Sequence, residues 1–235
     1  MGYGNFIGHE AVNAKYTNDN GGVWNLKDAY KESLVDGWDF SSPQYIAHNT
    51  TTTNTFTYPS GIRSGDFILL VSCANGTNAR SGFTGFFDIA SQTANPRYTI
   101  NYRIADGTET GNITSSTGTN EAGMICVFGS NSRSIYDTIS PTEAPNDPNG
   151  DVTAEVTTGN YSSNITLIAA AITNDANSSL DGTPSGYTLI AGVAGGGVGL
   201  AILYKTNNLK NTTYNTAGLS FVSTSTHRGR LISIV

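Results

Sequence analysis

The strongest strand signal in the chain is Asp66-Phe-Ile-Leu-Leu-Val-Ser72, in which five consecutive apolar residues lie between polar ends. A similar stretch, Asn164-Ile-Thr-Leu-Ile-Ala-Ala170, occurs about 100 residues later. Three further pairs of similar blocks keep the same order. They are Gly82-Phe-Thr84 with Gly186-Tyr-Thr188, Thr99-Ile-Asn-Tyr-Arg103 with Ala201-Ile-Leu-Tyr-Lys205, and Gly123-Met-Ile-Cys-Val-Phe128 with Gly229-Arg-Leu-Ile-Ser-Ile234. This ordered set predicts two similar half-units.

The half-units, at about residues 41–140 and 150–235, each combine apolar strands with a Gly-aromatic-Thr turn. Such spacing is typical of antiparallel sandwiches. We therefore expect an all-β fold over residues 41–235, a jelly-roll-like antiparallel β-sandwich whose halves are related by a rough pseudo-twofold axis. Two separate small sandwiches joined by a linker at 141–150 are the alternative, although neither half looks able to cover both of its faces alone.

The apolar runs also predict where individual strands lie. Continuous runs at 67–71, 124–128 and 165–172 indicate central strands that are buried on both faces. Residues 98–102 alternate between apolar and polar side chains, which predicts a half-exposed strand. Cys73 and Cys126 both fall within apolar runs, so we expect buried thiols rather than a disulfide or metal ligands.

Residues 1–40 differ in character and predict an N-terminal arm followed by one short α-helix. Leu26, Tyr30 and Leu34 recur at helical spacing. So short a helix is marginal alone, so we expect it to dock on its own domain, a sister chain or another protein. Trp24 and Trp38 bracket the helix and fit two interpretations equally: they pin it to the β domain, or they anchor the chain in a larger assembly.

Composition and charge narrow the classes of partner. The chain has 235 residues, a formal net charge of −6 and only 13% charged residues. It contains no basic run, so nucleic acid is not an expected partner. It also has no cationic segment followed by an apolar one at its start and no run of eighteen apolar residues, so neither secretion nor membrane insertion is expected.

A search for catalytic or metal-binding patterns gives no positive signal. The three histidines have no metal-ligand spacing, and neither a nucleophile elbow nor a phosphate loop is present. The glycine-rich run at 192–199 lies between two strand-like runs and is interpreted as a flexible hairpin tip. The turn at 147–151 offers oxygen donors, but a solvated turn is favoured over a cation site. We expect no cofactor, no metal and no enzymatic activity.

One segment carries a resemblance to a known class of proteins. Gly22-Val-Trp-Asn-Leu, Tyr30 and Gly37-Trp38 resemble a pattern near the start of structural proteins of marine tailed bacteriophages, notably those that infect cyanobacteria. In those proteins a β domain follows with a Gly-Asp strand start, a Pro-x-Gly-aromatic-Thr turn and a Tyr-basic strand end. Here 65–69, 184–188, 102–103 and 204–205 match these features, so the resemblance covers roughly residues 20–235.

The resemblance implies a virion structural protein, assembled in the host cytoplasm, that belongs to a tail fibre or other host-facing appendage. It implies that residues 1–40 attach the chain to other virion proteins, and a homo-oligomer, guessed to be a trimer, is expected. Six residues carry this expected attachment: Val23, Trp24, Leu26, Tyr30, Leu34 and Trp38. A capsid decoration or cement protein is the alternative, and a glycan hydrolase is a weaker third hypothesis.

Host contact is expected at two polar loops of the sandwich, because such loops on a rigid scaffold commonly carry function. The loops are 75–80 and 174–179. We expect them to bind host surface glycans by hydrogen bonding and aromatic stacking. The candidate residues in these loops are Asn75, Asn78, Arg80, Asn174 and Asn177.

Overall fold

The computed structural model describes residues 42–129, 155–157, 165–207, 212–222 and 225–234. The chain divides after Phe40 into two units, and all described residues belong to the second, Ser41–Val235. The expected N-terminal helix, the six expected attachment residues and the turn at 147–151 lie outside the described residues.

Every regular element in the described part of the chain is a β-strand, as predicted for the fold class. The strands of the first half are β1 (Gln44–Thr51), β2 (Phe56–Thr57), β3 (Phe67–Ala74), β4 (Ser81–Phe83), β5 (Phe87–Gln92), β6 (Arg97–Ile104), β7 (Asn112–Ile113), β8 (Ser115–Thr117) and β9 (Ala122–Gly129). Those of the second half are β10 (Glu155–Thr157), β11 (Ile165–Thr173), β12 (Leu180–Gly182), β13 (Thr188–Gly195), β14 (Val198–Asn207), β15 (Thr213–Asn215), β16 (Ser220–Phe221) and β17 (His227–Ile234).

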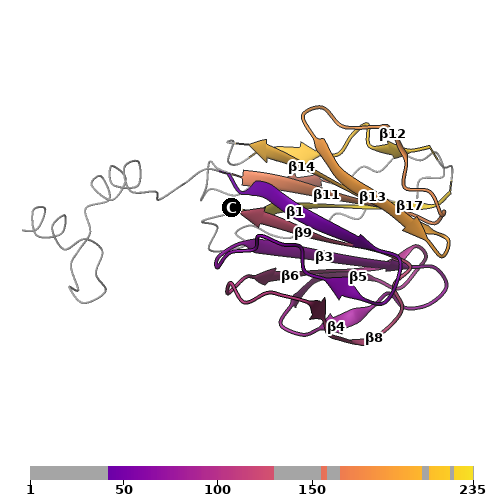
Figure 1. The fold of residues 1–235 in the computed structure, drawn as a ribbon. Helices are drawn as coiled ribbons and strands as arrows, with labels where there is room; N and C mark the ends of the chain where they lie inside the picture. Colours follow the sequence, from indigo (N-terminus) through magenta and orange to yellow (C-terminus); the bar gives the residue numbers. More distant parts are fainter. Residues whose placement is uncertain (1–41, 130–154, 158–164, 208–211, 223–224, 235) are drawn as a thin grey trace, which may run out of the picture. The chain divides into compact units, whose positions relative to one another are not determined.

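Two large antiparallel sheets dominate the domain, one from each half of the chain (Figure 1). The first sheet has the strand order β1-β9-β3-β6-β5, and the second has the order β13-β14-β11-β17. Read from β9 and from β17, the two halves therefore share one order, β9-β3-β6-β5 and β17-β11-β14-β13. The internal repeat predicted from the sequence is a repeat of topology.

The register of the strands fixes which residues correspond in the two halves. Tyr102 of β6 pairs with Phe87 at the start of β5, and Tyr204 of β14 pairs with Thr188 at the start of β13. Even the register shift early in β5, between Asp88 and Ala90, recurs in β13 between Leu189 and Ala191. Such shifts mark β-bulges, which twist an edge strand and hinder pairing with another chain.

Two of the four matched sequence blocks were misaligned. Leu69 of β3 and Ile168 of β11 both face the core between the sheets, which places the true match one residue away from the pairing of Asp66 with Asn164. A slip of one residue turns every side chain to the opposite face, so the block match was wrong in register.

The glycine turn was also matched wrongly. The counterpart of Gly186 is Gly85 rather than Gly82, because each of these two glycines precedes an edge strand and has positive φ. Phe86 N donates to Phe83 O at 3.1 Å, and Tyr187 N donates to Pro184 O at the same distance. The same turn therefore leads into both edge strands.

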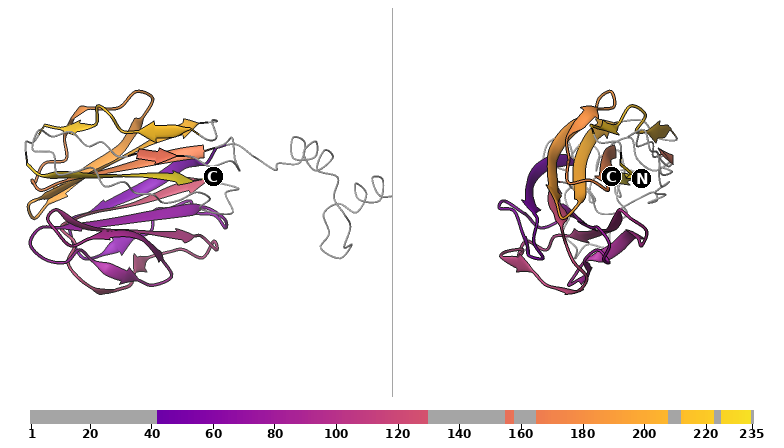
Figure 2. Two further views of the ribbon diagram at one scale, coloured as in Figure 1. Left: turned by 180° about the vertical axis from the view of Figure 1, so that it is seen from behind. Right: turned by 90° about the vertical axis from the view of Figure 1, so that its right-hand side faces the viewer.

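The two large sheets enclose one shared core, which argues against two separate sandwiches. Side chains from both sheets interdigitate, among them Leu69 and Met124 from the first sheet with Ile168 and Ile202 from the second. Figure 2 shows the two layers from the end of the strands. Burying aliphatic side chains of this size contributes about 1.5–3 kcal/mol each, so this core is a major source of the domain's stability.

Short strand pairs cover the outer face of each large sheet. β2-β7 and β4-β8 carry Phe56, Phe83 and Ile113 onto Ile68 and Leu70 of β3. In the second half, β12-β16 and β10-β15 occupy the equivalent place. The runs at 67–71, 124–128 and 165–172 are therefore buried on both faces, as predicted. The expectation of a half-exposed strand at 98–102 was wrong, because Tyr98 and Ile100 face the shared core and Thr99 and Asn101, on the opposite face, are buried as well.

Candidate functional site

The sandwich has two chemically different ends, which the strand register defines. At one end β1 begins at Gln44 opposite Gly129, and β17 ends at Ile234. We name this the terminal end. At the other, β3 ends where Ala74 pairs with Arg97, and β11 ends where Thr173 pairs with Gly199. We name this the loop end, because it holds both loops that the sequence singled out, 75–80 and 174–179.

Loops of both halves meet at the loop end. A Cβ atom at Gly197, in the β13-β14 hairpin tip, would lie 2.7 Å from Asn75 Nδ2, and one at Gly196 would lie 2.4 Å from Glu121 Cδ. On the other side, Arg228 of β17 donates to the Asn95 carbonyl oxygen at 3.4 Å. The glycine-rich run at 192–199 does form a hairpin tip, and the tip packs closely on the first half.

The loop at 75–80 is held by hydrogen bonds from three directions. Asn75 N donates to Glu121 Oε2 at 2.7 Å. From the β5-β6 turn, Asn95 Nδ2 donates to Asn75 Oδ1 at 3.0 Å, and Gly76 N donates to Asn95 Oδ1 at 3.1 Å. From β6, Thr99 Oγ1 donates to the Arg80 carbonyl oxygen. The loop is thus preorganised by neutral and charged acceptors.

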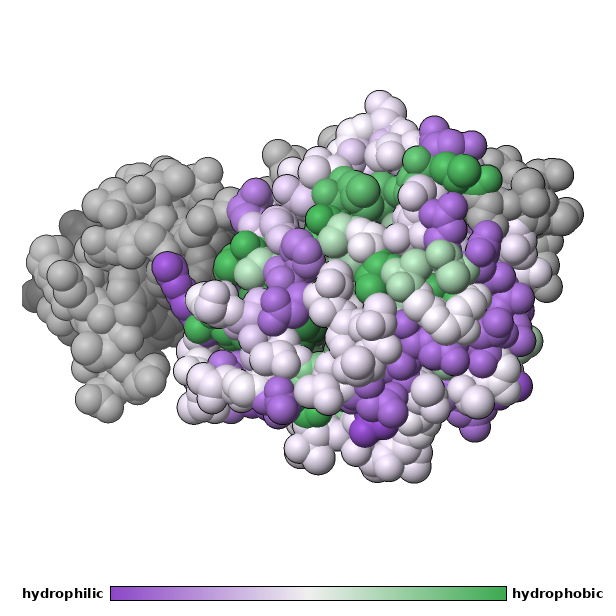
Figure 3. Space-filling view, turned by 45° about the vertical axis from the view of Figure 1, so that its right-hand side comes forward, coloured by the Kyte–Doolittle hydropathy of each residue, from purple (hydrophilic) through white to green (hydrophobic). Residues whose placement is uncertain are grey.

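Two arginines flank this loop. Arg80 Nη1 donates to Gly118 O at 3.0 Å, and its Nε donates to Ser115 Oγ. Arg97 Nη1 donates to Asn78 Oδ1 at 2.9 Å. In the described part of the chain neither guanidinium has a carboxylate at ion-pair distance. Figure 3 brings the loop end forward, and hydrophilic side chains gather on the right-hand side of that view.

The equivalent loop of the second half, 174–179, is built differently. Asn174 N donates to Thr226 O at 2.9 Å, and Asn177 Oδ1 accepts from Ser179 N at 2.9 Å in a local turn. A Cβ at Gly199 would lie 2.3 Å from the Asn177 carbonyl oxygen, so the loop backbone rests directly on the strand. Its charged residue is acidic, Asp175.

The five predicted contact residues all lie at the loop end, but four of their side chains form hydrogen bonds within the domain. Asn75, Asn78, Arg80 and Asn177 each form hydrogen bonds within the chain. The sequence predicts them as host-contact residues and does not indicate these internal hydrogen bonds. It did not identify Arg97, whose only signal is a cation at the start of a strand directly after an Asn-Pro turn.

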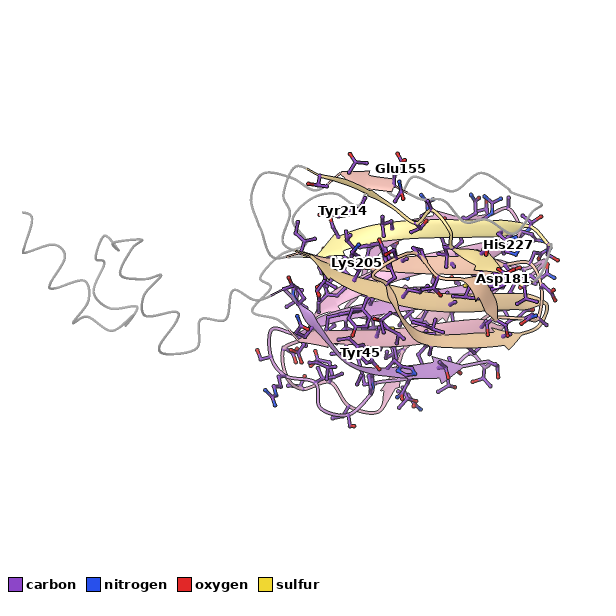
Figure 4. All side chains as sticks on the ribbon, turned by 90° about the horizontal axis from the view of Figure 1, so that it is seen from above. Tyr45, Glu155, Asp181, Lys205, Tyr214 and His227 are labelled. Atoms are coloured by element: carbon purple, nitrogen blue, oxygen red, sulfur yellow. The ribbon has the colours of Figure 1, made fainter. Side chains whose placement is uncertain are left out.

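The terminal end carries a cluster of charged side chains around Arg103. Arg103 Nη2 lies 2.7 Å from Asp106 Oδ2 and 2.9 Å from Glu109 Oε1, and the Glu109 side chain is fully buried. Hydrogen bonds from Thr108 hold the pKa of the Asp106 carboxyl below its usual range. In Figure 4, Lys205 and Tyr45 lie toward this end, whereas His227 and Asp181 lie toward the loop end.

Between the sheets, one arginine is buried against a tyrosine. Arg230 Nε donates to the Tyr98 hydroxyl, and the guanidinium carbon lies 5.6 Å from the centre of that ring. Burial raises the pKa of the Tyr98 hydroxyl, while Arg230 acts in the opposite direction. The contact joins β17 to β6 across the shared core.

Groups that could do chemistry do not converge in the described part of the chain. No three His, Cys, Asp or Glu side chains are placed there to hold a metal ion. Cys73 and Cys126 are free and buried, as predicted, and burial raises the pKa of both thiols. His48 Nδ1 is 2.6 Å from the Tyr45 hydroxyl, and His227 stacks on Phe221. Among the described residues, no helix has the length and hydropathy to span a bilayer.

Comparison with known proteins finds no matching family model, no matching curated protein and no matching solved structure.

Proposed function

We propose that this chain is a non-enzymatic bacteriophage virion structural protein that forms part of a tail fibre or other host-facing appendage. It is assembled in the host cytoplasm and resides in the virion. Its sandwich presents the loop end to the host surface, where it binds glycans. The finer assignment of the sandwich as jelly-roll-like belongs to the same proposal, because the observed strand order defines only an antiparallel sandwich.

The observation that carries the proposal is the polarity of the domain. The described chain enters the sandwich at Ser42 and leaves it at Ile234, both at the terminal end. Thr166 Oγ1 donates to the Pro43 carbonyl oxygen and ties the entering chain to the second sheet. The polar loops lie at the opposite end, where a protein attached through residues 1–40 has room to touch another surface.

The same proposal assigns the partners. Residues 1–40 bind other virion proteins, and copies of the chain associate as a homo-oligomer, with a trimer as the working hypothesis. This rests on the resemblance of the segment at 22–38 to virion proteins and on the marginal stability of a short isolated helix. The proposed partners do not include nucleic acid, and the proposed function does not involve insertion into a membrane.

Adsorption blocking tests the proposal directly. Purified full-length chain, added to host cells before the phage that encodes it, is expected to lower phage adsorption in proportion to its concentration. Labelled chain is expected to bind the same cells. A chain that neither binds the cells nor competes with the phage overturns the host-contact role. Copy number separates it from a shell protein: a small multiple of three or six fits an appendage, and hundreds per particle fit capsid decoration.

A further inference from the structure

We propose that the loop end of the first half contains an anion-recognition site, formed by Arg80 at the end of the 75–80 loop and by Arg97, which contacts Asn78 of the same loop, that binds the carboxylate or sulfate groups of an acidic glycan. This inference rests on the proposed function and names the class of glycan.

The two guanidiniums have N–H groups that form no hydrogen bond within the described chain. An arginine carries five N–H donors in a planar fork that suits carboxylate and sulfate oxygens. Arg97 donates from Nη1 to Asn78 Oδ1, and its Nε is buried, so Nη2 is the nitrogen of its fork that remains for a ligand. Arg80 uses Nε and Nη1 on the neutral groups of Ser115 and Gly118. Both side chains are held in place but not neutralised.

The internal repeat allows the two arginine positions to be compared with their counterparts in the second half. Register places Gly199 where the first half has Arg97. Ser179 directly precedes β12, as Arg80 directly precedes β4. The second half therefore builds the same strand-loop-strand unit with no cation at either position. The repeated topology therefore forms without a cation at these positions, and the presence of both arginines in one half only points to a ligand.

The loop that carries Arg80 and contacts Arg97 is held in place by hydrogen bonds. The hydrogen bonds of Asn95 and Glu121 to Asn75 fix the loop, and Ser72 Oγ joins Arg80 N, at 3.2 Å, to Asn120 Oδ1, at 2.9 Å. A ligand that meets a preorganised loop loses less binding free energy to the ordering of side chains. The two arginines are thus presented on a fixed frame.

The net charge of the chain acts against an acidic ligand at long range. The whole chain is acidic, with a formal net charge of −6, so its long-range field repels a polyanion. Binding of an acidic glycan must therefore come from close contacts at this site rather than from diffuse attraction. Such contacts weaken as salt increases, because partly exposed charges are screened. A polymer with repeated anionic groups gains affinity by engaging several copies in an oligomer.

The test uses full-length chain and three immobilised polymers: polygalacturonate for carboxylates, dextran sulfate for sulfates, and neutral dextran. Arg97→Gln and Arg80→Gln remove one charge each at the site. Arg63→Gln is the matched control, because Arg63 is exposed outside the loop end and the substitution changes the net charge equally. Melting curves verify that each variant is folded, and Arg80→Gln carries the test if Arg97→Gln does not fold.

We expect binding to at least one anionic polymer and none to neutral dextran. Each site variant is expected to weaken that binding about tenfold, as for the loss of one charge-assisted contact, whereas Arg63→Gln changes it less than about twofold. Equal effects of site variant and control, or equal binding to neutral dextran, would overturn the site. If Arg97→Gln still blocks phage adsorption as well as the original chain, the anion site fails and the appendage role stands. If neither protein blocks adsorption, the appendage role fails as well.

Discussion

The two halves of the sandwich share one strand order and one core, but they differ in the loop that follows β3 and β11. In the first half, Arg97 reaches from the start of β6 to Asn78 of the loop. In the second, Gly199 leaves no side chain at the equivalent place, and the Asn177 carbonyl oxygen occupies it. The core and the strand order thus belong to the repeat, whereas the arginines at positions 80 and 97 are specific to the first half.

The largest effect is expected in the shared core. Leu69→Ala and Ile168→Ala are equivalent substitutions, one in each half, and both side chains are fully buried between the sheets. Each is expected to destabilise the domain by about 2–5 kcal/mol through the cavity it leaves. Because the halves share one core, denaturant unfolding is expected to remain a single transition for both variants. Two separate transitions, with only one shifted, would support two independent sandwiches.

The next effect tests the loop comparison itself. Gly199→Ala places a Cβ against the backbone of Asn177, which is expected to cost about 1–3 kcal/mol by overpacking. Arg97→Ala, at the equivalent place, removes one partly exposed hydrogen bond and is expected to cost about 1 kcal/mol or less. Urea denaturation of both variants measures the difference. A larger loss for Arg97→Ala would mean that the arginine has a structural role, and would weaken the case for a ligand.

A smaller change of opposite sign is expected at Asn101. This side chain is 1% exposed, and neither of its amide atoms has a hydrogen-bond partner among the described residues. Its counterpart in the second half is Leu203, which packs in the outer core. Asn101→Leu is therefore expected to stabilise the domain by about 1 kcal/mol, because an unsatisfied buried amide is removed. Loss of stability in the same denaturation assay would show that the two outer layers are not equivalent.

The smallest effect depends on pH. Burial raises the pKa of Tyr187, and its counterpart in the first half is Phe86. A raised folded-state pKa favours the neutral phenol in the folded chain. Below pH 10, the ordinary pKa of the phenol in the unfolded chain, the hydroxyl is neutral in both states and the folded chain keeps its full stability. As the pH rises above 10, the unfolded chain loses this proton first, so the free energy of unfolding falls. The Tyr187 hydroxyl is buried without a hydrogen-bond partner among the described residues, so Tyr187→Phe is expected to raise stability at pH 7 by less than about 1 kcal/mol. It is also expected to make the loss of stability above about pH 10 less steep. An unchanged alkaline slope would contradict burial of this hydroxyl.

Much of the fold could be predicted because the central strands β3, β9 and β11 are continuous apolar runs. The matches of Tyr102 with Tyr204 and of Gly123 with Gly229 agree with the observed register. The match at Asp66 failed by one residue because β3 and β11 are apolar on both faces, so their sequences do not reveal which face a residue occupies.

The outer layer could not be predicted. Its eight strands, such as β2 and β16, have two or three residues each, too few to show a period. Without that layer, the alternation within 98–102 predicted that Thr99 and Asn101 lie on an exposed face, whereas both are buried. The loop end was predicted as a polar surface, but the internal hydrogen bonds of Asn75 and Asn78 depend on Asn95 and Arg97, which meet these loops only in the folded chain.

A cryo-EM map of the virion that encodes this chain shows whether the loop end faces away from the particle. We expect an appendage in which residues 75–80 and 174–179 lie at the distal surface and the ends at Ser42 and Ile234 point toward the particle. A map in which those two loops are buried against the capsid shell would contradict it.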